Sequence, residues 1–215
     1  MSTKIKICGI TKPEEAAYLN ETKVDYAGFV FYEKSKRNIT IKQAKDIFSC
    51  LDNDIKRVAV MVSPKVEDII EKQENDFDIL QVHGDLTLDV LKSATLPVWY
   101  AINISDETEA NRKMTYIDEL PDELASKIEA LVVDAPSFGS GQTFNWKKSK
   151  RLKKAGAQSP PLDKMFVLAG GLNASNVKEG IELFNPDVVD ISSNVEGKNG
   201  KDRDLIFEFV KAVKE

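Results

Sequence analysis

The side chains that could do chemistry stand at the ends of short apolar runs. The run KIKICGI, residues 4–10, carries Cys8 near its end, and the run ALVVDA, residues 130–135, carries Asp134. A thiol at an exposed strand end can serve as a base or a nucleophile. A carboxylate is costly to desolvate unless it is paired or reactive, although aspartate also starts turns. Cys8 and Asp134 are therefore candidate acid–base residues.

Other polar side chains follow other apolar runs. His83, the single histidine, comes two residues after Gln81 in ILQVHG, and a loop carbonyl could equally satisfy its ring. Arg37 follows the second run, where a fixed guanidinium could pair with a carboxylate or be one more solvated charge beside two lysines. Asp190 in the last run adds a second carboxylate.

Small residues near the last two runs indicate an anion site. Gly170 and Gly171 end the run MFVLAGGL, and Ser192 and Ser193 follow VVDI. Backbone N–H groups at a helix N-terminus favour phosphate, and barrels often hold phosphate after strands seven and eight. A glycine-rich loop after ALVVDA, which includes Gly141, could add donors to the same anion. Tight turns and a flexible loop are the alternatives.

Strands and helices in alternation must position these side chains. Continuous runs rich in Val, Ile and Phe fit strands of a parallel sheet that is buried on both faces. Thr40 can cap a helix with one apolar stripe, and Cys50 falls within that helical pattern, where we expect it only to pack. The predicted strands are 4–10, 26–32, 56–62, 79–84, 97–103, 130–135, 165–172 and 188–196.

The number of these units predicts the fold. Eight units in 215 residues leave about 27 residues per unit, close to the minimum for a strand, a crossover helix and two loops. We therefore expect a single (β/α)8 TIM barrel with eight parallel strands over residues 1–215. A doubly wound sheet usually has fewer strands and a G-x-G-x-x-G turn, which this chain lacks. In a barrel, the strand ends converge on one face, so the candidate side chains should meet there.

The composition limits the possible partners. The chain has 30 basic and 35 acidic residues, a net charge of -5 and 42% hydrophobic residues, as in a globular protein that does not bind nucleic acid. No apolar run approaches the roughly 18 residues of a membrane helix, and no signal peptide is evident. Cys8 and Cys50 have neither metal-ligand nor disulfide-framework spacing. We expect a cytoplasmic protein with reduced thiols and no metal.

Together the motifs resemble the phosphoribosylanthranilate isomerase family of tryptophan biosynthesis. The resemblance implies a cofactor-independent Amadori rearrangement of N-(5′-phosphoribosyl)anthranilate to 1-(o-carboxyphenylamino)-1-deoxyribulose 5-phosphate, which converts an aldose into a ketose. The matching blocks lie between Lys6 and Asp202 in the family's order: KICGIT, GFVF followed by SKR, QVHG, VVDA, GSGQTFNW, LAGGLNASNV and VDISSNVEGKNGKD.

The resemblance also implies residue roles. Cys8 matches the general base and Asp134 the general acid of the family. Arg37 matches an arginine at the anthranilate end of the substrate, and Asp190 matches an aspartate near the substrate. The predicted substrate-binding set is Arg37, Gln81, His83 and Asp190, and the predicted phosphate-binding set is Gly141, Gly170, Gly171, Ser192 and Ser193.

Departures from the family pattern bear on affinity more than on reaction type. The family usually has Pro at residue 36, Gly at 138, Asp at 145 and Gly at 194. This chain has Lys36, Phe138, Asn145 and Asn194. Asn194 adds a side chain near the predicted phosphate site.

Two other functions remain as alternatives because a fold does not fix a function. Another phosphosugar barrel enzyme would call for a catalytic lysine at a strand end or for a metal with several histidine ligands. A non-catalytic barrel that binds a phosphorylated metabolite would need the phosphate site but not the pair of Cys8 and Asp134. In each case the expected partner is a small phosphorylated molecule, and we expect a monomer or a weak homodimer.

Overall fold

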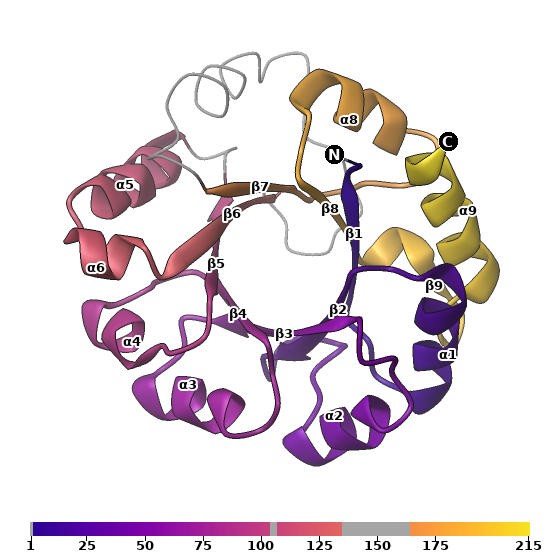
Figure 1. Cartoon of the computed structure of the whole chain (residues 1–215), viewed down its shortest axis with the longest axis horizontal. Coiled ribbons are helices and arrows are strands. Elements are labelled where there is room, and N and C mark those ends of the chain that lie inside the picture. Colours follow the sequence, from indigo (N-terminus) through magenta and orange to yellow (C-terminus); the bar gives the residue numbers. More distant parts are fainter. Residues whose placement is uncertain (1, 104–106, 135–163) are drawn as a thin grey trace.

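Parallel strands form a closed barrel. The computed structural model describes residues 2–103, 107–134 and 164–215, with Glu107 and Asp134 described by their backbone alone. The strands pair in chain order, and the last pairs with the first, Lys6 lying opposite Asp190. This closure confirms the predicted eight-stranded TIM barrel (Figure 1). The strands are β1 (Lys4–Cys8), β2 (Tyr26–Phe31), β3 (Lys56–Val62), β4 (Ile79–His83), β5 (Val98–Asn103), β6 (Ile128–Asp134), β7 (Met165–Leu168) and β8 (Val188–Ile191).

Helices form a ring outside the strands, and α1 and α9, from the two ends of the chain, lie against each other (Figure 1). The described helices are α1 (Pro13–Thr22), α2 (Ile41–Phe48), α3 (Val66–Gln73), α4 (Leu88–Ser93), α5 (Glu107–Asp118), α6 (Asp122–Ala125), α8 (Val177–Phe184) and α9 (Arg203–Lys214). A 3-10 turn, η1 (Ser193–Val195), and a small hairpin, β9 (Glu196–Gly197) with β10 (Gly200–Lys201), follow β8. Within the described ranges, no helix has the length and apolarity needed to cross a membrane.

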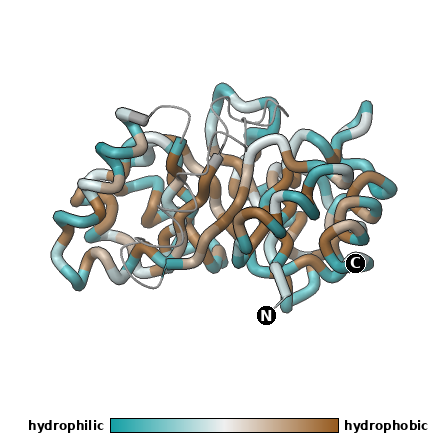
Figure 2. Tube along the Cα trace, turned by 90° about the horizontal axis from the view of Figure 1, so that it is seen from above, coloured by the Kyte–Doolittle hydropathy of each residue, from teal (hydrophilic) through white to brown (hydrophobic). Residues whose placement is uncertain are grey.

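The strands are buried on both faces, as their apolar runs predict. Along β1, Ile5 and Ile7 pack toward the helices, whereas Cys8 belongs to the core inside the barrel. Successive side chains of a strand point to opposite faces, so Lys6 shares the inner face with Cys8. Figure 2 shows the same division along the trace, with hydrophobic strands at the centre and mixed character in the helices.

The segment around α2 shows one correct and one wrong prediction. Thr40 caps the helix as expected, since its side chain accepts a hydrogen bond from the backbone of Gln43. The helix ends at Phe48, and the chain then tightens into i→i−3 hydrogen bonds from Cys50 and Leu51. This turn leaves Leu51 buried and Cys50 exposed, so the expectation that Cys50 packs is wrong.

Candidate active site

A cavity of about 470 Å³ opens where the carboxyl ends of the strands meet. It brings together residues from the two ends of the chain and from its middle, as parallel strands of a barrel require. Its lining contains the predicted site residues Cys8, Arg37, Gln81, His83, Gly170, Gly171, Asp190, Ser192 and Ser193.

Asp134 and Gly141 are the two remaining predicted site residues. Asp134 ends β6 and pairs in register with Asn103 of β5, so its backbone belongs to the same barrel face as the end of β1. The side chain of Asp134 and the whole of Gly141 lie outside the described residues.

Cys8 sits in a buried position at the end of β1, opposite Gly28 of β2. A Cβ atom on residue 28 would lie 2.8 Å from Cys8 Sγ and 3.0 Å from Lys6 Nζ, so glycine leaves room for both groups. Burial raises the pKa of the Cys8 thiol above its usual range, while the ammonium groups of Lys6 and Lys201 act in the opposite direction.

Lys6 and Asp190 form an ion pair inside the barrel. Lys6 Nζ lies 2.8 Å from Asp190 Oδ2, and both side chains are buried. Burial lowers the pKa of Lys6, but the Asp190 carboxylate and Cys8 outweigh it and hold that pKa above its usual value. Lys6 is therefore a charged ammonium. Sequence reasoning missed it, although a lysine two residues before Cys8 in an apolar strand was a visible signal.

Glu196 of β9 holds two cations at the edge of the cavity. Its Oε1 accepts hydrogen bonds from Nε of Arg37 and, at 3.0 Å, from Nζ of Lys201. Lys201 also donates to the backbone carbonyl of Ser192 at 2.8 Å. Burial raises the pKa of Glu196, but Arg37 and Lys201 outweigh it and keep that pKa below its usual range. Glu196 is thus a carboxylate, and sequence reasoning missed it as well.

The contact with Glu196 orients Arg37. The terminal nitrogens of this guanidinium have no hydrogen-bond partner within the described part of the chain, since only Nε is engaged. The aliphatic part of Arg37 crosses Gly9, where a Cβ atom would clash with Arg37 Cδ. A guanidinium held by its stem and its Nε presents its outer edge, which matches a carboxylate.

Gln81 and His83 lie side by side on the inner face of β4. Gln81 Nε2 and His83 Nε2 are 2.8 Å apart. Burial lowers the pKa of His83 to about 3, and the charges of Lys6 and Lys113 add to this. The ring is therefore neutral, with Nε2 accepting a hydrogen bond from the amide of Gln81. Gln81 Oε1 and Asp190 Oδ1 are buried acceptors without a partner among the described residues.

Four of the predicted phosphate residues, Gly170, Gly171, Ser192 and Ser193, line the same cavity. Gly170 and Gly171 have φ of 88° and 69°, a backbone conformation that side chains disfavour. The hydroxyl of Ser192 donates to the carbonyl of Cys8 at 3.0 Å and so links the ends of β1 and β8. Asn194, a departure from the family pattern, donates its amide to the carbonyl of Leu172 at 2.9 Å. Its side chain thus bonds to the loop after β7.

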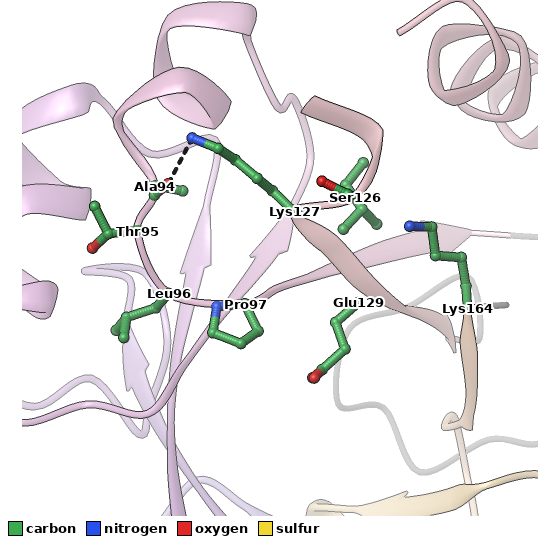
Figure 3. A pocket seen from close by; sticks show the side chains of 9 residues that line it. Ala94, Thr95, Leu96, Pro97, Ser126, Lys127, Glu129 and Lys164 are labelled. Atoms are coloured by element: carbon green, nitrogen blue, oxygen red, sulfur yellow. Dashed lines mark hydrogen bonds between the residues drawn. The ribbon is translucent and has the colours of Figure 1, made fainter. Parts of the chain in front are cut away.

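A second cavity, of about 580 Å³, lies among the loops that lead into β5, β6 and β7 (Figure 3). Its charged groups already have partners. Lys127 donates to carbonyls at the end of α4, including that of Ala94 at 2.8 Å, and Glu129 accepts from Trp99 at 2.9 Å. These contacts join neighbouring elements at the face of the barrel where stability is usually determined.

The described residues contain no group of three or more His, Cys, Asp or Glu side chains arranged to hold a metal ion. The charged side chains that line the first cavity are instead those of Lys34, Lys36, Arg37, Asp190 and Glu196, and the ammonium groups of Lys6 and Lys201 act on Cys8. These groups can move protons and bind anions.

A closed parallel barrel whose polar cavity opens at the carboxyl ends of its strands defines a TIM-barrel enzyme, because active sites of this fold lie on that face. The family model described as N-(5'phosphoribosyl)anthranilate (PRA) isomerase matches residues 5–212. The chain belongs to the phosphoribosylanthranilate isomerase family.

Known relatives agree over the full length. N-(5'-phosphoribosyl)anthranilate isomerase of Thermoanaerobacter pseudethanolicus is 38% identical over 217 residues, which cover 98% of each chain. A structure of monomers generated from the dimeric phosphoribosylanthranilate isomerase of Thermotoga maritima has a TM-score of 0.80 at 31% identity and covers 99% of this chain and 98% of its own. A structure of a phosphoribosyl anthranilate isomerase in complex with reduced 1-(o-carboxyphenylamino)-1-deoxyribulose 5-phosphate has a TM-score of 0.79 at 30% identity and covers 99% of this chain and 98% of its own.

Proposed function

We propose that the chain isomerises N-(5′-phosphoribosyl)anthranilate to 1-(o-carboxyphenylamino)-1-deoxyribulose 5-phosphate in tryptophan biosynthesis, with Cys8 as general base and Asp134 as general acid. The observation that carries the proposal is the cavity in which Cys8, Arg37 and the glycine–serine rim meet in a chain of this family. The similar structure in complex with the reduced product supports the choice of substrate.

The first step opens the sugar. A protonated Asp134 donates to the furanose ring oxygen, the bond from that oxygen to C1′ breaks, and the substrate nitrogen supplies the electrons to form an iminium at C1′. Asp134 ends β6, at the barrel face where catalytic side chains of this fold stand. The iminium then withdraws electrons from C2′ and makes its proton acidic.

The second step moves a proton from carbon to sulfur. The Cys8 thiolate takes the C2′ proton, which leaves an enolamine, and the enolamine becomes the ketone when C1′ gains a proton and the 2′ hydroxyl loses one. The thiol must ionise for this step. Burial acts against ionisation, and the nearby cations Lys6 and Lys201 favour it.

The remaining side chains fit the parts of this substrate. The free edge of Arg37 suits the anthranilate carboxylate. The open acceptors Gln81 Oε1 and Asp190 Oδ1 suit sugar hydroxyls, and neutral His83 orients the amide of Gln81. The substrate phosphate binds to the loop that contains Gly141 and to the rim formed by Gly170, Gly171, Ser192 and Ser193.

Four coarser features belong to the same proposal. The reaction uses no cofactor and no metal, because acid–base groups suffice for it. Residues 1–215 form one domain. The protein works in the cytoplasm, where its thiols stay reduced. It exists as a monomer or a weak homodimer and binds a phosphorylated small molecule, not nucleic acid or membrane.

The direct test is consumption of phosphoribosylanthranilate, followed by fluorescence with purified protein and a chelator. Cys8→Ala and Asp134→Asn should each lower kcat by at least roughly 10²-fold, the scale of one acid or base, because each removes one proton-transfer group. Their affinity for the reduced product should change much less, since neither substitution removes a phosphate or carboxylate contact.

Cys50→Ala is the matched control for the thiol, since Cys50 is exposed and does not line the cavity. It should retain full activity. Full turnover by Cys8→Ala or by Asp134→Asn would contradict the assigned roles. If the wild-type protein binds the reduced product tightly but does not consume phosphoribosylanthranilate, a non-catalytic barrel is favoured instead.

A further inference from the structure

The inner face of β1 carries a buried cation next to the proposed base. Lys6 and Cys8 are two residues apart and point into the barrel, and both groups lie within 3.0 Å of the point where a Cβ atom on Gly28 would stand. The Lys6 ammonium donates to Asp190 Oδ2 at 2.8 Å, and its charge favours the thiolate form of Cys8. Lys6 is completely inaccessible to solvent, so its charge is not screened by water.

A buried ion pair is weak evidence for stability, because the cost of removing two charges from water is about as large as their attraction. A pair of apolar side chains of similar size could fill the space of Lys6 and Asp190. The pair instead lies beside the reacting thiol: Lys6 Nζ is 2.8 Å from Asp190 Oδ2, and Lys6 Nζ and Cys8 Sγ both adjoin Gly28. This position favours a role in the chemistry of Cys8.

We infer that Lys6 is a positioning residue that holds a positive charge against the sulfur of Cys8 and thereby stabilises the thiolate, while Asp190 keeps the ammonium in place. The inference rests on the proposed function, in which Cys8 is the base. It adds to that function a reason why a buried thiol can ionise.

Charges from three elements act on the sulfur. Lys6 of β1 and Lys201 of β10 favour the thiolate, whereas Asp190 of β8 opposes it. His83 of β4 is neutral and contributes no charge above about pH 3. Since these two charges are opposite, their removal should have opposite effects. Loss of the Lys6 charge should raise the pKa of Cys8, and loss of the Asp190 charge should lower it.

Lys6 itself is not the base. Its ammonium form is stabilised by Asp190, so it has no free lone pair to accept a proton from carbon at neutral pH. A lysine that acted as base would need the opposite, a pKa lowered toward neutrality.

The experiment measures the rate of alkylation of Cys8 by iodoacetamide against pH, followed by mass spectrometry in a Cys50→Ser background. The thiolate is the reacting form, so the midpoint of the rate reports the pKa of Cys8. Lys6→Met should move the midpoint upward by about one unit, which corresponds to about tenfold less thiolate below it. Asp190→Asn should move the midpoint downward, and Lys6→Arg should leave it near its original value.

Lys6→Met leaves Asp190 buried without its partner, so the double variant Lys6→Met with Asp190→Asn serves where the single one does not fold. It contains no unpaired buried charge, and its midpoint should lie above that of Asp190→Asn alone, because the two variants differ only in the Lys6 charge; the acid limb of kcat/KM should move in parallel. A midpoint equal to that of Asp190→Asn alone would overturn the inference.

The two proposals fail separately in this design. Alkylation of Cys8 needs no substrate. If the Lys6 substitution shifts the alkylation midpoint but the wild-type protein does not turn over phosphoribosylanthranilate, the proposed function is wrong and the effect of Lys6 on Cys8 stands. Normal turnover by the wild type, together with equal alkylation midpoints in the double variant and in Asp190→Asn, would remove the role of Lys6 and leave the proposed function.

Discussion

Arg37 shows how one carboxylate can prepare another charged side chain for its ligand. Glu196 accepts a hydrogen bond from Nε of Arg37, which lines the cavity, and leaves the terminal nitrogens of the guanidinium for a ligand. Lys201 donates to the same oxygen of Glu196 and fixes this carboxylate, so the arginine is held before a substrate arrives. An arginine held in this way loses less rotamer entropy when it binds a carboxylate.

Glu196→Ala should raise KM for phosphoribosylanthranilate by about tenfold and change kcat much less, because the lost contact orients a binding group. Steady-state kinetics separates the two constants. Glu208→Ala, an exposed substitution on α9, is the control and should leave both unchanged. A fall in kcat with constant KM would show that Glu196 acts on the reacting atoms instead.

His83 offers a clean titration because it is the single histidine of the chain. Burial lowers its pKa to about 3, so the imidazole should stay neutral from pH 8 to pH 5. Nuclear magnetic resonance of nitrogen-labelled protein should show one set of ring signals that does not move over this range. A shift with a midpoint near the ordinary value of about 6.5 would mean that the ring is solvated or paired with a carboxylate.

The same pKa predicts an effect on stability with a definite sign. Below about pH 6.5 the unfolded chain binds a proton at His83 and the folded chain does not, so acid favours unfolding. The free energy of unfolding should fall by up to about 1.4 kcal/mol per pH unit from this group until the pH approaches 3. Urea titrations of the wild type and His83→Asn should differ in slope by this amount between pH 6 and 4.

At the level of elements, the sequence predicts the strands and the residues at their ends, because both depend on a local pattern of apolar side chains. Apolar runs gave each strand, and the ends of those runs gave Cys8, His83 and Asp190, because a strand end fixes which side chains face the rim. Lys6 and Glu196 were missed since their partners are remote. Lys6 meets Asp190 at a separation of 184 residues, and Arg37 meets Glu196 at 159. Such pairs exist only after the barrel closes.

Helix ends show a second limit of local patterns. An apolar stripe predicts which helix face is buried but not where the helix stops, so Cys50 was assigned to packing although it lies past the end of α2. The stop depends on the geometry of the turn, where the i→i−3 bond from Leu51 to Phe48 replaces the helical one.

The cap of α9 should contribute measurably to stability. The Asp202 carboxylate accepts hydrogen bonds from the backbone of Asp204 and Leu205 at 3.0 and 3.1 Å, and its negative charge lies at the positive end of the helix dipole. Asp202→Ala should lower the free energy of unfolding by about 1 kcal/mol, measured in urea. Glu208→Ala, in the middle of the same helix, should have little effect, and an equal loss in both variants would contradict the role of the cap.

For the whole molecule, closure of the barrel and assembly of the site are one event. The pairing of β1 with β8 sets Lys6 opposite Asp190, and the contact of α1 with α9 covers this seam. The serine link from Ser192 to the carbonyl of Cys8 crosses the same seam. The proposed base therefore acquires its charged neighbours only when the first and last strands meet, which ties activity to complete folding.

The outer surface of the molecule predicts a weak tendency to associate. Within the described ranges, Ile70 of α3 and Leu88 of α4 are the exposed large apolar side chains, 42% and 45% accessible, and their helices contact each other. A stable dimer usually buries roughly 800 Å² per partner around an apolar centre, more than two half-exposed side chains supply. The dimeric state of the Thermotoga maritima relative thus need not extend to this chain.

Light scattering at micromolar concentration should accordingly give a mass near 24.0 kDa, with a rise only at much higher concentration. Ile70→Ser combined with Leu88→Ser should reduce that rise, since these side chains offer the apolar contact on the described surface. A mass of twice that value at micromolar concentration, unaffected by the double substitution, would place a stable interface elsewhere on the protein and refute the expectation.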